Sequence, residues 1–228
     1  MKRVVILIMM MASVLYGFVG FGVTGGTNLI SHPARLFPLT VDESPVGAFS
    51  YDGFENAISL GGYIYVDALP IVDLDLELNV KIAPYYFNFK QNSGLSSQEN
   101  LDFVWTSSSL YMTIQTDLLK TSIPFIAKLR IFAGAGINNH SSTPMVNQVM
   151  LEAIMNDDVE NGIFDSQKMI DYLDENKIEI GGFHIQLGAQ FKLLFFDSML
   201  IYRHVFTDRI TLDTKRFDSL NLRLGYGL

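Results

Sequence analysis

Charged or polar side chains occur at every second position in one stretch of the sequence, "VDLDLELNVKI" at residues 72–82. Asp73, Asp75, Glu77 and Lys81 share one parity of this stretch, and apolar residues occupy the positions between them. Successive side chains of a β-strand point to opposite faces of a sheet. A strand here therefore has one apolar face and one face whose carboxylates and amine could bind ions, move protons or pair with opposite charges.

Basic residues follow the same alternation in later segments and could pair with these carboxylates. A carboxylate enclosed in a narrow interior must be paired or lose its charge. We expect a charge network inside the fold, with Arg203 as a further candidate member; its eight predicted members are Asp73, Asp75, Glu77, Lys81, Lys128, Arg130, Lys192 and Arg223. The network either exchanges partners as the gate of a small conduit or stays a static plug. Eight strands enclose only enough room for side chains, which favours the plug.

Eight segments have the period-two alternation of β-strands and are separated by turn residues. They span residues 18–30, 56–68, 72–89, 101–117, 125–138, 178–195, 199–208 and 217–228. Residues 31–53 contain three prolines and are predicted to form a long loop. The phase of the seventh segment is open, because either Arg203 or His204 must share a face with apolar neighbours. No repeat or linker divides these segments, so residues 18–228 are predicted to form one all-β domain.

The N-terminus has the pattern of a signal peptide over residues 1–17. "MKR" supplies the positive start and "VVILIMMMASVLYG" an apolar core of export-signal length. The alternative is a retained transmembrane helix, since residues 4–23 form a long apolar run. The glycines in the later part of that run disfavour a helix.

Strand length, loop length and composition predict which face points outward. Strands of roughly 10–14 residues fit the crossing of a tilted bilayer, and short and long connections alternate along the chain, as in spanning barrels. Only 18% of residues are charged, against roughly 25% in a typical soluble domain. Aromatic residues near strand ends resemble interfacial girdles; they are Tyr85, Tyr86, Phe87, Phe89, Phe103, Trp105, Phe195 and Phe196. We expect an eight-stranded antiparallel up-and-down transmembrane β-barrel with its apolar face outward.

Residues 139–177 interrupt the alternation and are predicted to be the third outer loop, with a helical insertion of two short helices. The first is expected within 142–157, with Ser142 or Thr143 as N-cap and Pro144 at its first position. The second is expected within 165–176, capped by Asp165. Their apolar stripes could cover the barrel mouth, lie on the outer leaflet, bind a partner, or pack on each other and the rim.

Several classes of function are disfavoured by composition and spacing. A net charge of −8 leaves no basic excess for nucleic acid, and the absence of cysteine removes thiolate metal sites and cysteine nucleophiles. No spacing places a serine beside a histidine on one face, and no metal-ligand pair or phosphate-binding glycine loop is found. We therefore expect no catalytic, cofactor-binding or metal-binding residues, no cofactor and no enzymatic activity.

The chain resembles the small outer-membrane β-barrel proteins of the OmpA/OmpX type. The resemblance lies in "MKRVVILIMMMASVLYG", the eight alternating segments, the alternating loop lengths and the final strand "SLNLRLGYGL". It implies the outer membrane of a Gram-negative-type cell envelope, contact with outer-membrane lipid, and recognition of the C-terminal strand by the barrel-assembly machinery. The C-terminal signal that this machinery reads more often ends in phenylalanine. Leu228 departs from this pattern, and Tyr226 partly compensates for the departure. The resemblance is architectural and transfers no functional site.

The predicted function is a porin-like membrane scaffold that presents extracellular loops to an unknown extracellular partner. Two alternatives remain open: a small gated channel, and a soluble exported lipocalin-like ligand-binding barrel whose apolar face points inward.

Overall fold

The computed structural model describes residues 18–41, 44–67, 71–91, 97–123, 126–154, 166–211 and 214–227. The predicted signal peptide at residues 1–17 lies outside this range and stays a prediction. The described elements are β1 (Phe18–His32), β2 (Arg35–Val41), β3 (Ser44–Tyr51), β4 (Phe54–Asp67), β5 (Asp73–Gln91), β6 (Ser97–Ile123), β7 (Ala127–Ser142), α2 (Gln148–Ile154), α3 (Ser166–Glu175), β8 (Ile178–Leu193), β9 (Phe196–Thr211) and β10 (Thr214–Gly227).

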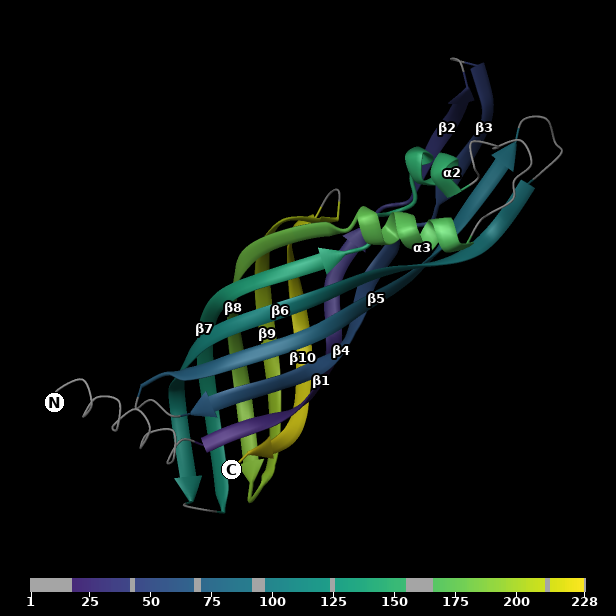
Figure 1. Cartoon of the computed structure of the whole chain (residues 1–228). Coiled ribbons are helices and arrows are strands. Elements are labelled where there is room, and N and C mark those ends of the chain that lie inside the picture. Colours follow the sequence, from purple (N-terminus) through teal and green to yellow (C-terminus); the bar gives the residue numbers. More distant parts are fainter. Residues whose placement is uncertain are drawn as a thin grey trace.

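Eight of the strands form a ring (Figure 1). Each pairs antiparallel with two others, in the order β5-β4-β1-β10-β9-β8-β7-β6, and β6 pairs back with β5. Glu77, for example, lies opposite Tyr63 of β4 on one side and Tyr111 of β6 on the other. The first and last strands of the chain, β1 and β10, also pair with each other. The nearly all-antiparallel β architecture is the one that the alternation predicts.

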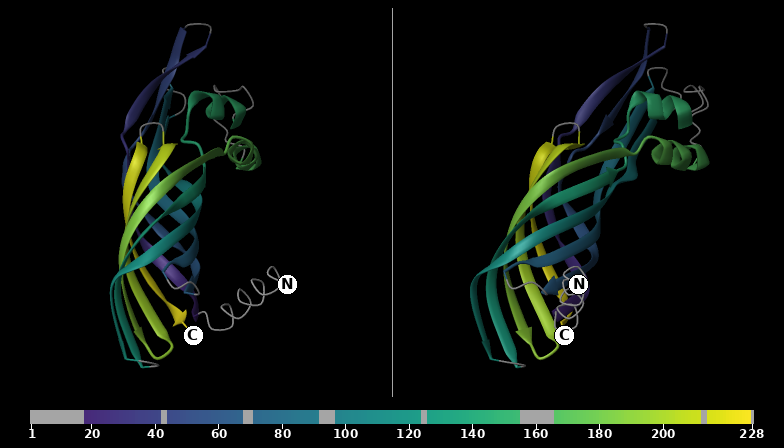
Figure 2. Two further views of the ribbon diagram at one scale, coloured as in Figure 1. Left: turned by 90° about the vertical axis from the view of Figure 1, so that its left-hand side faces the viewer. Right: turned by 60° about the vertical axis from the view of Figure 1, so that its left-hand side comes forward.

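The prediction of a long loop at residues 31–53 is wrong, because β2 and β3 form a hairpin there and β3 pairs with the end of β5. Beyond the ring, β5 and β6 continue with this hairpin into a projecting sheet, which we call the arm: β2, β3 and residues 83–91 and 97–106 (Figures 1 and 2). Prolines suggested a loop, but Pro38 lies on the edge strand β2, where a missing N–H is tolerated. The sheet thus contains ten strands, of which eight form the ring.

Several strands are longer than predicted and take over residues expected in turns. β6 continues to Ile123 and β7 to Ser142, β9 already begins at Phe196, and β9 and β10 together extend over most of residues 209–216. The tight turn after β8 is at residues 194–195, where Leu194 has a φ of 54°.

Both helices occur between β7 and β8, but the first begins later than predicted. Ser142 is the last residue of β7, and the N-cap of α2 is Asn147, whose Oδ1 accepts a hydrogen bond of 2.9 Å from the Met150 amide. The predicted cap of the second helix, Asp165, lies outside the described residues. Within the part of the chain that is described, no helix is long and apolar enough to cross a membrane.

Aromatic residues at the start of the arm form a buried cluster, and the prediction that they belong to an interfacial girdle is wrong for most of them. We call this cluster the aromatic cap; its buried ring residues include Phe49, Tyr51, Phe54, Tyr85, Phe87 and Trp105. Met150, Leu151 and Ile154 of α2 are buried in the same cluster, and α3 packs against it through partly buried side chains. Helix α2 therefore buries most of its apolar side chains on the arm and α3 does so in part, while Val149 and Ile170 are exposed. Tyr86, by contrast, is exposed.

The ring has an apolar outer face and a polar inner face. On β5, Leu74, Leu76 and Leu78 are 49%, 40% and 59% exposed, whereas Asp75 and Glu77 are 4% and 0% exposed. The same division holds around the ring, where outward side chains include Phe21, Ile64, Ile114, Leu200 and Leu222. The apolar face therefore points outward, as the strand pattern predicts.

Glycines on the inner parity let neighbouring strands and side chains approach closely. A Cβ on Gly136 of β7 would lie 1.9 Å from the backbone oxygen of Met112 on β6. Replacing Gly136 with alanine should therefore distort the β6–β7 pairing and lower the free energy of unfolding by about 1–3 kcal/mol. Gly181→Ala on β8 is the matched control, because its Cβ would meet nothing nearer than 3.8 Å. Urea unfolding of the two variants in detergent would measure the difference, and equal effects would contradict the steric explanation.

Candidate functional site

The inner face of the ring contains an ionic cluster centred on Glu77. The guanidinium of Arg203 donates to both carboxylate oxygens of Glu77, at 3.1 and 3.0 Å. Arg223 donates from Nε to Glu77 Oε2 at 3.1 Å, and its two terminal nitrogens donate to Asp75 at 2.6 and 3.0 Å. These four side chains come from β5, β9 and β10 and are almost completely buried. We call them the central ionic cluster.

Aromatic faces complete the surroundings of the two arginines. The guanidinium carbon of Arg203 lies 4.0 Å from the centre of the Tyr111 ring, and that of Arg223 lies 4.7 Å from the centre of the Tyr63 ring. A guanidinium stacks well on an aromatic face because it is planar and weakly hydrated. The central ionic cluster is thus held by two carboxylates that accept hydrogen bonds from the guanidinium groups and by one aromatic ring beside each guanidinium.

A second group of charges lies between this cluster and the end of the ring at which β8 turns into β9. Arg130 pairs with Asp73 and, at 3.0 Å, with Asp117. Lys128 donates to Asp67 at 2.7 Å. These pairs place further fixed charges across the inside of the ring.

Asp197 is buried in the same region and accepts hydrogen bonds from two neutral donors. Gln190 Nε2 donates to both of its oxygens at 2.7 Å, and the Tyr65 hydroxyl donates to Oδ2. Lys192 lies opposite both Asp197 on β9 and Lys128 on β7 in the strand register. A buried carboxylate with several donors is far less costly than an isolated one.

Lys81 is fully buried at the other side of the central ionic cluster, toward the aromatic cap. Its amine contacts the Ser109 hydroxyl and lies 3.5 Å from His140 Nδ1. It also lies 5.3 Å from the centre of the Tyr111 ring. No ion pair of Lys81 occurs among the residues that the structure describes.

The structure places all eight residues of the predicted network on the inward parity of their strands, with Lys128 and Lys192 only partly buried. Asp75, Glu77 and Arg223 come together, as do Asp73 and Arg130, whereas Lys128 pairs with Asp67 instead of a carboxylate of β5. The network members that the prediction missed are Asp67, Asp117 and Asp197, and Arg203 was only a candidate. The signal for Asp197 was its parity, which it shares with Arg203 on the same strand.

A serine and a histidine do lie side by side, contrary to the expectation from spacing. Ser109 and His140 are register partners on β6 and β7, and the Ser109 hydroxyl is 2.7 Å from His140 Nδ1. Both side chains are almost fully buried beneath the aromatic cap, with Lys81 beside them. The arrangement fills the interior with hydrogen-bonded groups. Among the described residues, no group of three or more histidines and carboxylates is arranged to hold a metal ion.

No protein-family model matches the sequence, and no curated protein sequence matches it. Solved structures are similar in fold. Ail, the attachment invasion locus protein of Yersinia pestis, is 12% identical, with 93% of this chain and 99% of that chain covered and a TM-score of 0.43. OprG from Pseudomonas aeruginosa is 10% identical, with 92% and 93% covered and a TM-score of 0.44. The N-terminal β-barrel domain of OprF from the same species is 11% identical, with 92% and 97% covered and a TM-score of 0.42.

These structures are outer-membrane β-barrel proteins, the group that the sequence resembles. At 10–12% identity, the likeness assigns no functional residue to this chain.

Proposed function

We propose that the chain closes into a transmembrane β-barrel of an outer membrane and presents the arm, α2 and α3 outside the cell to an extracellular partner. The observation that carries this proposal is the band of exposed apolar side chains around a polar, ion-paired interior. In water, such a surface would drive aggregation. In a bilayer, the same side chains contact acyl chains and carry no hydration penalty. Most charges of the interior are paired with one another, in the central ionic cluster and in the Arg130 and Lys128 pairs, so they need no water outside the ring.

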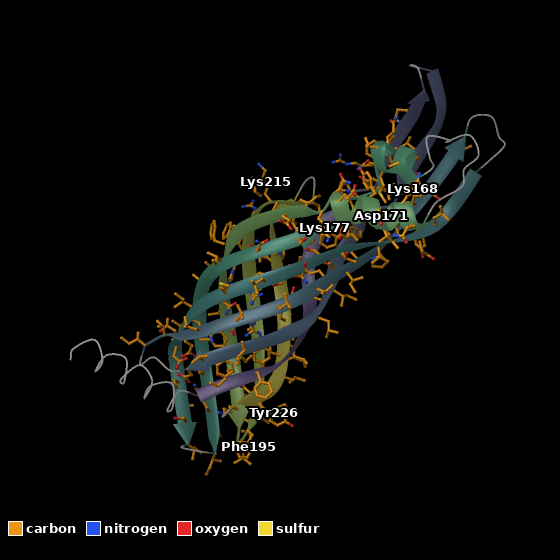
Figure 3. All side chains as sticks on the ribbon, viewed as in Figure 1. Lys168, Asp171, Lys177, Phe195, Lys215 and Tyr226 are labelled. Atoms are coloured by element: carbon orange, nitrogen blue, oxygen red, sulfur yellow. The ribbon has the colours of Figure 1, made fainter. Side chains whose placement is uncertain are left out.

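The height of the apolar band fits a bilayer. On β9 and β10 it begins at the exposed pair Phe196 and Tyr226 and reaches Phe206, ten positions along β9. At 3.3 Å per residue and a tilt of about 40°, this distance corresponds to about 25 Å, the apolar height of outer-membrane barrels. Figure 3 places Phe195 and Tyr226 at one end of the ring and the charged residues Lys168, Asp171 and Lys177 toward the arm.

The orientation follows from the length of the connections. The connections β6–β7 and β8–β9 at the end opposite the arm are short, while the arm and both helices lie at the other end (Figures 1 and 2). Short turns face the periplasm in barrels of this kind and longer connections face outward. The exposed alternation of β10, with Leu220, Leu222, Leu224 and Tyr226, supports the prediction that the barrel-assembly machinery reads this strand.

Single cysteine variants test the proposal cleanly, because the chain has no cysteine of its own. On intact cells, Lys168→Cys on α3 should react with a membrane-impermeant maleimide, whereas Phe195→Cys in the β8–β9 turn should react only after the outer membrane is permeabilised. Both positions are exposed, so the comparison isolates the side of the membrane. Labelling of both on intact cells, or recovery of the protein in the osmotic-shock fluid, would contradict the proposal.

The two alternatives fit the interior less well. A lipocalin-like carrier needs an apolar cavity, but the inside of the ring is filled by the central ionic cluster and its neighbours. A channel requires this cluster and the aromatic cap to move. We propose a plugged scaffold without enzymatic activity; steady ion conductance of the purified protein in planar bilayers would favour the channel instead.

A further inference from the structure

Three polar side chains interrupt the apolar outer face on β9 and β10. His204 and Asp218 are register partners, and Nδ1 of His204 lies 2.5 Å from Oδ1 of Asp218. The hydroxyl of Tyr202, two positions along β9, donates to the same oxygen at 2.7 Å. All three point outward, and the side chains of His204 and Asp218 are 26% and 33% exposed. We call these three residues the outer polar trio.

The outer polar trio lies just below the upper end of the apolar band, which Phe206 marks on β9. Below it, toward Tyr226, the outward positions of both strands are apolar except for Ser198, and they include Leu200 and Leu222. Above it, the next outward pair is Phe206 and Arg216. A charged group that faces lipid is strongly unfavourable at mid-membrane and nearly neutral at the boundary. His204 and Asp218 therefore lie one outward pair, about 5 Å along the barrel axis, below the end of the band, where they are within reach of lipid headgroups.

The contacts within the trio fix the direction in which His204 can bind. Since Asp218 accepts from Nδ1, the remaining nitrogen, Nε2, is the one free to turn toward the membrane. Phe206 holds the imidazole by an edge contact with ring centres 4.5 Å apart, and Phe206 in turn stacks on Phe183 at 4.4 Å. The ring is thus oriented by a carboxylate on one side and an aromatic pair on the other.

Arg216 supplies a permanently cationic group beside this imidazole. It lies two positions from Asp218 on the same face of β10, diagonally across from His204 in the register, and is exposed. Diagonal neighbours on paired strands are within reach of long side chains. Arginine binds phosphate oxygens through parallel N–H donors, and an imidazolium adds a further charge-assisted hydrogen bond.

We propose that His204 and Arg216 bind the phosphate group of a membrane lipid headgroup, and that Asp218 and Tyr202 position His204 for this contact. The inference rests on the proposed function, because only in a membrane does this face meet headgroups. The ligand chemistry is a phosphate monoester carried on a diacyl lipid. Inorganic phosphate offers the same group without the acyl chains that would lie against Leu200 and Leu222.

The test compares lipid retention by the full chain in detergent solution. Native mass spectrometry would measure binding of phosphatidic acid against diacylglycerol with the same acyl chains. We expect wild-type protein to prefer phosphatidic acid by about tenfold, and His204→Leu and Arg216→Gln each to reduce the preference several-fold, as loss of a charge-assisted hydrogen bond predicts. Lys215→Gln is the matched control: it removes the same charge one residue away, on the other parity of β10 (Figure 3), and should leave the preference unchanged.

The positioning role of Asp218 has its own readout. In wild-type protein, the ¹⁵N chemical shift of His204 Nε2 should move on addition of phosphatidic acid. In Asp218→Leu, which leaves no acceptor for Nδ1, that movement should be lost although Arg216 is intact. An unchanged response in Asp218→Leu would overturn the assigned role.

Three results would overturn the lipid site itself. One is equal retention of both lipids by wild-type protein. Another is an equal loss in Lys215→Gln and Arg216→Gln, which would indicate diffuse surface charge. The third is displacement of phosphatidic acid by millimolar inorganic phosphate, which would indicate a site for the free anion. In each case, heat-modifiable migration of the same samples on unboiled gels would still report a closed barrel, so failure of the lipid site is distinguishable from failure of the proposed function.

Discussion

Replacing Glu77 with glutamine is expected to lower the free energy of unfolding by about 3–5 kcal/mol. The carboxylate of Glu77 accepts from both Arg203 and Arg223 and is fully buried. Its loss leaves Arg203 without a carboxylate partner among the described residues, while Arg223 keeps Asp75. An unpaired cation in a dry interior is the costly product of this substitution, more than the loss of the hydrogen bonds themselves.

The double variant Glu77→Gln with Arg203→Gln separates these two contributions. It removes the unpaired guanidinium and leaves the Asp75–Arg223 pair intact, so it should be more stable than Glu77→Gln alone by about 1–2 kcal/mol. If Glu77 stabilises the protein only by filling space, adding Arg203→Gln to Glu77→Gln should not restore stability. Glu179→Gln, on an exposed carboxylate of β8, is the control and should change stability by less than about 0.5 kcal/mol.

The intrinsic fluorescence of the protein can follow both variants. Trp105 is the only tryptophan in the sequence and lies buried in the aromatic cap. Urea titration in lipid vesicles should shift its emission in one transition, with a lower midpoint for Glu77→Gln. If Glu77→Gln and Glu179→Gln unfold at the same urea concentration, the central ionic cluster is not an important source of stability.

The sequence predicts which face of a strand a residue occupies better than it predicts the position of that residue along the axis of the ring. Which face a residue occupies depends on local parity, so Asp75, Glu77 and Arg223 could be assigned to the interior from alternation alone. The partner of each charged side chain depends on how far neighbouring strands are staggered around the ring. No local sequence pattern encodes this stagger. For this reason the alternation predicts that Lys128 shares the interior with Asp73, Asp75 and Glu77 but does not predict its partner, Asp67 at the end of β4.

The phase of β9 shows a second limit of the alternation pattern. Met199 and Ile201 share the inward parity with Arg203 and pack with Tyr63 and other aromatic residues inside the ring. The interior is therefore apolar in places, and a strand that passes through such a layer has apolar residues on both faces. Only the register with β8 and β10 decides that Arg203 points inward and His204 outward.

The arm was missed because its strands are stabilised by contacts that no local pattern encodes. Phe37 of β2 stacks on Phe49 of β3 with ring centres 4.8 Å apart, and Phe49 contacts Phe87 of β5 at 6.1 Å. These residues are far apart in sequence and sit among prolines, which locally indicate a loop. The same long-range packing draws the aromatic residues of β5 and β6 into the aromatic cap, although strand-end aromatics locally indicate a membrane interface.

Replacing Leu200 with arginine should destabilise the protein in a bilayer by about 2–4 kcal/mol. Leu200 is 51% exposed, points outward from β9 and lies near the middle of the apolar band between Phe196 and Phe206. If hydrocarbon covers this surface, the guanidinium must leave water or pull headgroups inward. The same change on a surface covered by water would be nearly neutral or would improve solubility, so the sign and size of the effect report what covers the ring.

Leu36→Arg is the matched control for this substitution. Leu36 is 72% exposed on β2 of the arm, outside the apolar band, so the same chemical change there should alter the free energy of unfolding by less than about 0.5 kcal/mol. Reversible urea unfolding in vesicles of thin lipids, followed through Trp105, would measure both variants under one condition. A large loss of unfolding free energy for Leu200→Arg, with none for Leu36→Arg, requires that the ring is surrounded by a medium in which a charge is unfavourable. The hydrocarbon of a membrane is such a medium. Equal, small effects at the two positions would mean that water surrounds both, and the outward apolar face would then need a protein partner to cover it.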